Sequence, residues 1–400
     1  MRGKPIVMQG DPRLIIHCGF HKTGSTALQA TLRSSETRLR AAGFLYPYAG
    51  SRDRPGRISS DPSSSAHHNL AWHMVRHQLC NPAHGDPPAL LAEIAGFAGD
   101  VILSSEEFET LLTGADGPAI LHGLAGQAGR KLVLVIYLRN QIAYAETLFL
   151  ELIKHGIGTD YERHADEILQ TGHRRFEEAV HCFDYQRALA PLRASTDARI
   201  ILRNYHDLGP GGIVADFAGL FGLTDALRPS PGRETANHRQ STATALYTFH
   251  RNRTGQRPSP IERNRIMRIA ASTDQSTSSA DLQHRFARRF GPGNRALCTE
   301  WQLPTTGLDA ARMIRPASEL PLESLFSFET QCAITTPETA DLPAWLAAIG
   351  LENTTIPLSA RILDRLQQAH RYRRRVADRV INKIFNEPGS APAPAPSSPR

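Results

Sequence analysis

Short apolar runs alternate with segments of helical periodicity through the first half of the chain. Four runs rich in Val, Ile and Leu predict buried strands, at residues 14–16, 101–103, 131–138 and 198–202. The segments between them place apolar residues on one helical face, and an extended piece follows Gly43. This alternation predicts an α/β fold with a central parallel sheet between layers of helices.

The pattern changes in the second half of the chain. Residues 244–300 read as helical and basic, interrupted by a turn at 290–295. From 359 to 385, apolar residues at helical spacing oppose a face of arginines. Such a helix can lie on an anionic membrane surface, or it can dock on the domain with a solvated basic face. We therefore expect a main domain at 14–302, an unassigned extension at 303–350, a basic amphipathic helical segment at 351–387 and a disordered Pro/Ala/Ser tail at 388–400.

The most informative motif follows the first strand. Residues 19–26 read GFHKTGST and lead from a predicted strand into a predicted helix. A helix start offers unpaired N–H groups and a partial positive charge, and Gly19 and Gly24 let an anion approach the backbone. Nucleotide-hydrolysing P-loops carry their lysine after the second glycine, whereas Lys22 precedes Gly24. The motif predicts an anion site of another kind, rather than an ordinary strand–helix turn.

Polar residues also follow the next two strands. Ser104, Ser105 and Glu106 come after the second strand, and Arg139 comes after the third. Ligands of open α/β sheets bind at the carboxyl ends of the strands, so these side chains are site candidates. Arg139 offers a planar fork for phosphate oxygens, and Thr147 returns near the same helix face two turns later. Helix capping by the serines is an alternative that can hold alongside a role for Glu106.

Two further regions bear on the site. His67 and His68 lie at the entrance of a predicted helix, where they can act as a base or bind an anion, or simply cap the helix. Residues 49–66 form a polar loop that is long for a compact domain, which favours a role in shaping the site.

Composition narrows the class of protein. The chain has 46 Lys and Arg against 39 Asp and Glu, a net charge of +7, which suits an anionic cofactor. It lacks the dense basic patch with interleaved aromatics that is typical of nucleic-acid binding. The five cysteines are scattered without a C-x-x-C pair, which predicts reduced thiols and no zinc site. Because no apolar stretch reaches roughly 18 residues and no leader is visible, we expect a cytoplasmic protein, with peripheral contact at the inner membrane face through 359–385.

The loop and the strand-end arginine together resemble the P-loop sulfotransferases, which use 3′-phosphoadenosine 5′-phosphosulfate (PAPS). The resemblance covers roughly residues 14–300 and is specific at 22–26 and at Arg139 with Thr147. It implies a P-loop-type three-layer fold and a 3′-phosphate site formed by Arg139 and Thr147. At the position of Thr147 the family usually has serine. The implied 5′-phosphosulfate site consists of His21, Lys22, Thr23, Gly24, Ser25 and Thr26. The implied product is adenosine 3′,5′-bisphosphate, and no metal is required.

Sulfuryl transfer requires in-line positioning, stabilisation of developing charge and a base for the acceptor proton. Lys22 suits the bridging oxygen. Glu106 is the preferred base, with a pKa raised by the neighbouring anion, followed by His68, His67 and His21. The expected acceptor is a hydroxyl or amine of a saccharide or glycolipid, by analogy with bacterial relatives. A P-loop kinase or nucleotide hydrolase, and a non-catalytic binding protein on the same scaffold, stay open as alternatives.

Overall fold

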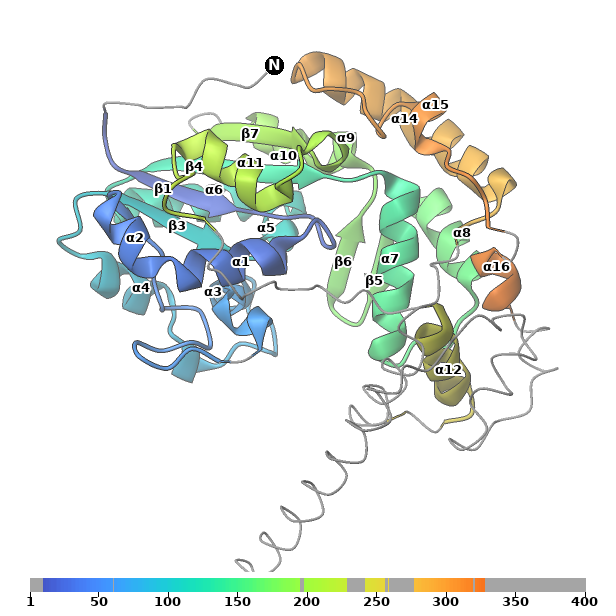
Figure 1. Cartoon of the computed structure of the whole chain (residues 1–400), viewed down its shortest axis with the longest axis horizontal. Coiled ribbons are helices and arrows are strands. Elements are labelled where there is room, and N and C mark those ends of the chain that lie inside the picture. The colour runs from blue at the N-terminus through green and yellow to red at the C-terminus, as the bar shows by residue number, and fades with distance from the viewer. Residues whose placement is uncertain are drawn as a thin grey trace, which may run out of the picture.

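The structure, a computed structural model, describes residues 10–59, 61–194, 198–228, 242–255, 258, 277–318 and 321–327. The predicted basic helix at 359–385 and the tail at 388–400 lie outside the described residues, as do 328–350 of the unassigned extension. Figure 1 shows the arrangement of the elements along the chain.

A five-stranded parallel sheet forms the centre of the fold, in the order β2-β3-β1-β4-β7. The central strand β1 pairs with β3 in the register Ile15↔Ile102 and with β4 in the register Ile15↔Val133. The predicted parallel α/β fold and its four strands are confirmed, and the extended piece after Gly43 forms the short edge strand β2. The strands are β1 Arg13–His17, β2 Phe44–Leu45, β3 Asp100–Ser104, β4 Lys131–Leu138 and β7 Arg199–Asn204.

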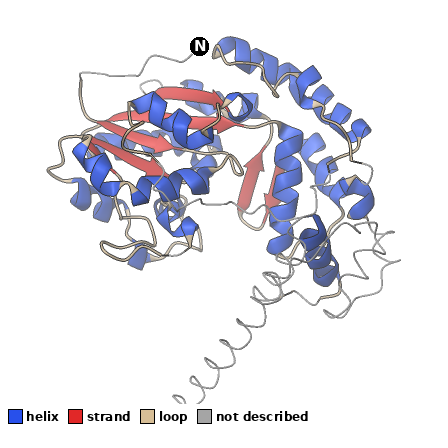
Figure 2. Ribbon diagram, in the orientation of Figure 1, coloured by secondary structure: helices blue, strands red, loops and turns tan. Residues whose placement is uncertain are grey.

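Helices cover both faces of this sheet, as the ribbon in Figure 2 shows. Alternate strand residues point to opposite faces, and because both faces are buried, β4 is an unbroken apolar run. Ile15, Ile102 and Val135 pack against α1 Ser25–Ser34, α2 Glu36–Ala41 and α11 Gly212–Phe221. The other face, with Ile16, Leu103 and Leu134, packs against α3 His68–Met74, α4 Pro87–Ile94, α5 Glu109–Thr113, α6 Gly117–Gln127, α9 Tyr185–Ala188 and α10 Ala190–Ala194.

A third apolar cluster lies beside the sheet, where Figure 1 shows α7, α8, α12 and α16 grouped together. Helix α7 follows β4 directly and therefore joins this helical part to the sheet. The elements of this helical part are α7 Gln141–Lys154, α8 Tyr161–Thr171, α12 Thr242–Arg253, α14 Ala280–Glu300, α15 Ala310–Met313 and α16 Leu322–Leu325. The antiparallel hairpin of β5 His173–Phe176 and β6 Ala179–Cys182 follows α8. Short 3-10 turns complete the fold at η1 Pro62–Ser65, η2 Pro82–His84, η3 Glu106–Phe108 and η4 Tyr205–Asp207.

Helix α14 corrects one prediction, because it runs unbroken through the expected turn at 290–295. Pro292 removes a backbone hydrogen bond and usually ends a helix. Tertiary packing outweighs that preference here. Asn294 is buried and exchanges side-chain hydrogen bonds of 2.8 and 2.9 Å with Gln141 of α7, and Phe290 and Leu297 are buried on either side.

The loop at 49–66 is organised around a buried arginine of α1. Arg33 is 1% exposed and donates to the carbonyl oxygens of Tyr46 at 3.0 Å and Pro47 at 2.7 Å. Its Nε lies 3.6 Å from the carboxylate of Asp53, which is fully buried and also accepts from Ser65 Oγ at 2.7 Å. A charge-assisted network of this kind fixes the loop against the domain.

We expect Arg33→Ala to destabilise the protein by about 3–5 kcal/mol, because it leaves the carboxylate of Asp53 buried without its cation. Arg52→Ala is the matched control, since Arg52 pairs with Asp61 on the same loop but both side chains are half exposed. Removing that exposed pair should change the free energy of unfolding by less than about 1 kcal/mol. Urea denaturation measures both values, and similar losses in the two variants would contradict the structural role of Arg33.

Candidate functional site

The turn between β1 and α1 has the backbone geometry of an anion cradle. Lys22 and Gly24 both adopt left-handed conformations, with φ of 68° and 87°. Gly24 caps α1 without a side-chain hydrogen bond, and the first turn of α1 contains no acidic residue. The N–H groups at this helix start are therefore left to a ligand. A Cβ at Gly19 would lie 2.6 Å from Ser25 Oγ, so a side chain at position 19 would displace the serine hydroxyl.

The hydroxyls of this loop have different surroundings. Thr23 is buried and donates to the carbonyl of Phe20 at 2.8 Å, which closes the turn. Ser25 is also buried, but its Oγ has no hydrogen-bond partner among the described residues. Thr26, the second residue of α1, is half-buried. Of the three expected hydroxyl ligands, Thr23 is thus committed to the loop itself and Ser25 is open to a ligand.

Two more buried polar atoms near the loop lack partners in the described part of the chain. They are Nε2 of His17 at the end of β1 and Oε1 of Gln29 in α1. The other nitrogen of His17 lies 2.8 Å from Ser104 Oγ, and burial lowers the pKa of His17 to about 4. Buried polar atoms are normally hydrogen-bonded, so this group favours a polar ligand at the loop. The sequence analysis missed both residues, because neither belongs to the glycine motif.

Lys22 is held by a carboxylate that the sequence analysis also missed. Its Nζ lies 2.8 Å from Glu151 of α7, which pairs in addition with Lys154 at 2.6 Å. Burial raises the pKa of the Glu151 carboxyl, but His155, Lys22 and Lys154 outweigh burial and hold it well below the usual range. An anion at the loop must therefore compete with Glu151 for Lys22. Nothing in the sequence between positions 22 and 151 signals this pairing.

Arg139 lies against the same loop, as the strand order predicts. It is 6% exposed and donates to the main-chain carbonyl of Lys22. Its guanidinium carbon lies 5.5 Å from the ring centre of Tyr205, the first residue of η4 after β7. Tyr205 also approaches Gly24, because a Cβ on that glycine would lie 3.9 Å from the tyrosine ring. Tyr205 is therefore a further residue of the site, and only the pairing of β4 with β7 reveals it.

Thr147 is less closely connected to the site. Its hydroxyl donates to the carbonyl of Ala143 within α7 at 2.7 Å. Among the described residues, no hydrogen bond or ion pair joins Thr147 to Arg139 or to the loop. The hydroxyl must turn away from Ala143 before it can donate to a phosphate.

Glu106 lies beside the loop because β3 pairs with β1. Its carboxylate accepts from the side-chain amide of Gln29 at 3.0 Å. Burial raises the pKa of Glu106, but His68, His21 and the Gln29 amide outweigh burial and lower it to about 2. Without a bound anion the pKa of Glu106 is therefore low, because two histidines and an amide face the carboxylate. The expected rise in this pKa applies to the protein with phosphosulfate bound and stays a prediction. Glu106 is ionised, as a base must be, but it is a weak one.

The two adjacent histidines have separate roles. His67 is fully buried, accepts from the Ser104 N–H at 3.1 Å and donates to the Pro47 carbonyl at 3.0 Å. Burial lowers the pKa of His67 to about 3. Because both ring nitrogens are hydrogen-bonded to backbone, His67 ties the loop to β3, and this geometry contradicts the prediction of His67 as a base. His68 is half-buried, and its Nδ1 lies 2.8 Å from Ser105 Oγ.

A cavity of about 240 Å³ opens beside His68. The indole of Trp72 stacks on the His68 ring with centroids 5.6 Å apart and forms part of the same wall. No acidic side chain contributes to the lining, which contains Gly50, Arg52, Ala66, His68, Asn69, Trp72, Leu79, Asn81 and His84. The cavity therefore offers the aromatic face of Trp72 and the side-chain amide of Asn81 to a ligand next to the candidate base.

Comparisons with protein-family models, with curated proteins and with solved structures find no match to this chain. In the part of the chain that the structure describes, no helix is both long and apolar enough to cross a membrane. The four cysteines in that part, at positions 18, 80, 182 and 298, are free thiols.

The left-handed backbone of Lys22 yields a test of strain at the site. Lys22→Gly and Lys22→Ala both remove the ion pair with Glu151, so they differ only in the residue that must adopt φ of 68°. Glycine avoids the Cβ clash of that conformation, and we expect the glycine variant to be more stable by about 1 kcal/mol. Urea denaturation compares the two. An alanine variant as stable as the glycine variant would show that position 22 is not strained.

Proposed function

We propose that this protein is a sulfotransferase of the P-loop type, which transfers a sulfuryl group from PAPS to a hydroxyl or amine of an acceptor. One observation carries the proposal. The guanidinium of Arg139 contacts the main chain of Lys22, so two cations and an uncapped helix start meet at one edge of a parallel sheet. That combination fits a ligand with two separate anionic groups, because a helix start and an arginine each bind one.

Each group at the site has a role in this proposal. The N–H groups of the first turn of α1 and the hydroxyls of Ser25 and Thr26 bind the 5′-phosphosulfate. Lys22 leaves Glu151 and stabilises the charge that develops on the bridging oxygen. Arg139, with the hydroxyl of Thr147 turned outward, binds the 3′-phosphate. Thr23 and Gly19 shape the loop.

The acceptor loses its proton to Glu106, with His68 as the second candidate. An incoming phosphosulfate adds negative charge near Glu106, which raises the pKa of the carboxyl toward the range of an effective base. The cavity beside His68 is the proposed acceptor site. The exposed part of Trp72 and the side-chain amide of Asn81 suit a saccharide, free or as the head of a glycolipid.

The kinase alternative is less favoured. Nucleotide-hydrolysing P-loops carry their lysine after the second glycine, whereas Lys22 precedes Gly24. The carboxylate beside this loop, Glu106, already accepts from the Gln29 amide. The non-catalytic alternative makes the same binding predictions as the enzyme and differs only in turnover.

Calorimetric titration with adenosine 3′,5′-bisphosphate tests the cofactor. We expect the wild type to bind it, and Lys22→Ala and Arg139→Ala each to weaken binding by roughly 10- to 100-fold, since hydrogen bonds to charged groups contribute about 1.5–3 kcal/mol. Lys131→Ala is the control, because Lys131 is exposed at the opposite end of β4. Binding of ATP with magnesium in place of the bisphosphate would support the kinase, and binding of neither would refute both nucleotide proposals.

Transfer of labelled sulfate from PAPS to a panel of saccharides tests the base. We expect Glu106→Gln to lower kcat by about 10²- to 10⁴-fold. The matched control Glu107→Gln, on the same 3-10 turn, should retain turnover. The pH profile separates the candidates. A Glu106 base is lost only as pH falls through its pKa, so kcat/KM should stay flat from pH 8 to 5, whereas a histidine base gives an acid limb in that interval. An acid limb that disappears in His68→Gln would transfer the role to His68.

A further inference from the structure

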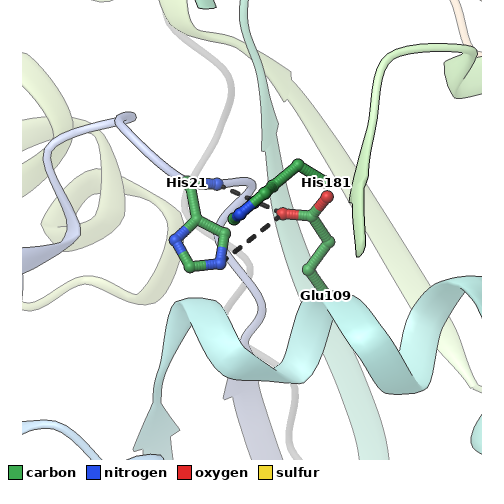
Figure 3. Close-up of side chains that lie close together, drawn as sticks. All are labelled: His21, Glu109 and His181. Carbon is green, nitrogen blue, oxygen red and sulfur yellow. Dashed lines mark hydrogen bonds and ion pairs between the residues drawn. The ribbon is translucent and has the colours of Figure 1, made fainter. Parts of the chain in front are cut away.

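Three side chains from distant parts of the chain converge at the loop of residues 19–26 (Figure 3). They are His21 of the loop, Glu109 at the start of α5 and His181 of β6. Each offers one ligand atom, and these atoms all lie within 4.8 Å of one another. Figure 3 shows nitrogen atoms of both imidazoles turned toward the Glu109 carboxylate. Glu109 and His181 belong to no step of the proposed transfer reaction, whereas His21 was also expected at the 5′-phosphosulfate site.

The surrounding backbone holds the three groups in this arrangement. One carboxylate oxygen of Glu109 accepts from the Cys182 N–H at 2.8 Å, and the other accepts from the His21 N–H at 3.3 Å. The His21 Nε2 lies 4.0 Å from that second oxygen. Nδ1 of His181 lies 3.4 Å from the Tyr144 hydroxyl. Hydrogen bonds around the ligating side chains that fix their orientation are typical of protein metal sites.

The three side chains of the cluster are largely shielded from solvent. Glu109 is 1% exposed and His181 is 5% exposed, and the His21 side chain is 19% exposed. The Nε2 of His21 stands too far from the carboxylate for a hydrogen bond. The gap between these atoms is thus bounded by two imidazoles and one carboxylate.

We propose that His21, Glu109 and His181 bind a divalent transition-metal ion, with Zn²⁺ the best match. Two imidazoles and a carboxylate are a ligand set of zinc sites, whereas Ca²⁺ and Mg²⁺ prefer oxygen ligands throughout. Ligand atoms about 2.0–2.2 Å from a tetrahedral zinc lie about 3.3 Å from one another. The cluster therefore has to close by up to about 1.5 Å to coordinate the ion.

An ion at this position joins three elements. His21 is the residue before Lys22, so the ion fixes the phosphate loop to α5 and to the β5–β6 hairpin. The fourth coordination position stays open to water or to an anion. This site does not depend on the proposed sulfuryl transfer. The expectation of no zinc site rested on short-range Cys and His spacing, which ligands at positions 21, 109 and 181 do not produce.

The experiment uses the full chain, freed of metal with a chelator and titrated with Zn²⁺ and, separately, with Mg²⁺. We expect one equivalent of Zn²⁺ per chain and no comparable Mg²⁺ binding. His181→Ala, His21→Ala and Glu109→Gln should each weaken Zn²⁺ binding at least tenfold and reduce the rise in Tm on zinc addition. Two control variants should retain both the Zn²⁺ binding and the rise in Tm. They are His122→Ala, at an exposed histidine on α6, and Cys182→Ser, which removes the neighbouring thiol.

A measurement on the wild type avoids dependence on the folding of the variants. X-ray absorption of the zinc-loaded protein should show nitrogen and oxygen neighbours, including two imidazoles, and no sulfur. Sulfur ligation, the absence of stoichiometric binding, or binding that persists in the His21→Ala, His181→Ala double variant would overturn the proposal. Bisphosphate titration of the metal-free protein decides the sulfotransferase proposal separately, so the two proposals fail independently.

Discussion

The pairing of β1 with β3 on one side and β4 on the other is the constraint on which the candidate site depends. Parallel neighbours end at the same edge of a sheet, so the turns that follow these three strands lie together. This arrangement brings Glu106 and Arg139 to the loop at residues 19–26, although about 80 residues or more of chain separate each from it. A slip of one residue in either register would exchange the side chains that pack against the two helix layers and would displace these groups relative to one another.

The charges at this edge are already balanced within the protein. Lys22 pairs with Glu151, and the histidines near Glu106 keep that carboxylate ionised. A multiply charged ligand therefore exchanges partners with groups that are in place, instead of entering a region of unopposed positive charge. Such exchange makes binding a difference between two sets of ion pairs, so the net affinity is smaller than the number of cations suggests.

Local patterns were sufficient to predict four of the strands, the parallel sheet that they form and the position of the loop. Apolar runs and glycine spacing are visible in short windows of sequence. The pairing of Lys22 with Glu151 and the convergence of His21, Glu109 and His181 were not predictable, since they arise only when distant segments pack. His67 was misjudged for the same reason, because its two backbone partners, Ser104 and Pro47, are set by tertiary structure. Pro292 shows that packing also overrides a strong local signal: the contact of Asn294 with Gln141 keeps α14 continuous where proline predicts a turn.

The backbone of the loop alternates in hand. Lys22 and Gly24 are left-handed, and Thr23 between them is not. Successive N–H groups in such an alternation point into a common hollow, a nest that attracts oxyanions through main-chain dipoles alone. Main-chain N–H groups contact only the oxyanion and not the rest of the ligand. Inorganic sulfate or phosphate can therefore compete with a larger ligand for the same N–H groups. In the proposed function, recognition of the nucleotide therefore has to come from outside the loop, where the Arg139 guanidinium lies 5.5 Å from the ring centre of Tyr205.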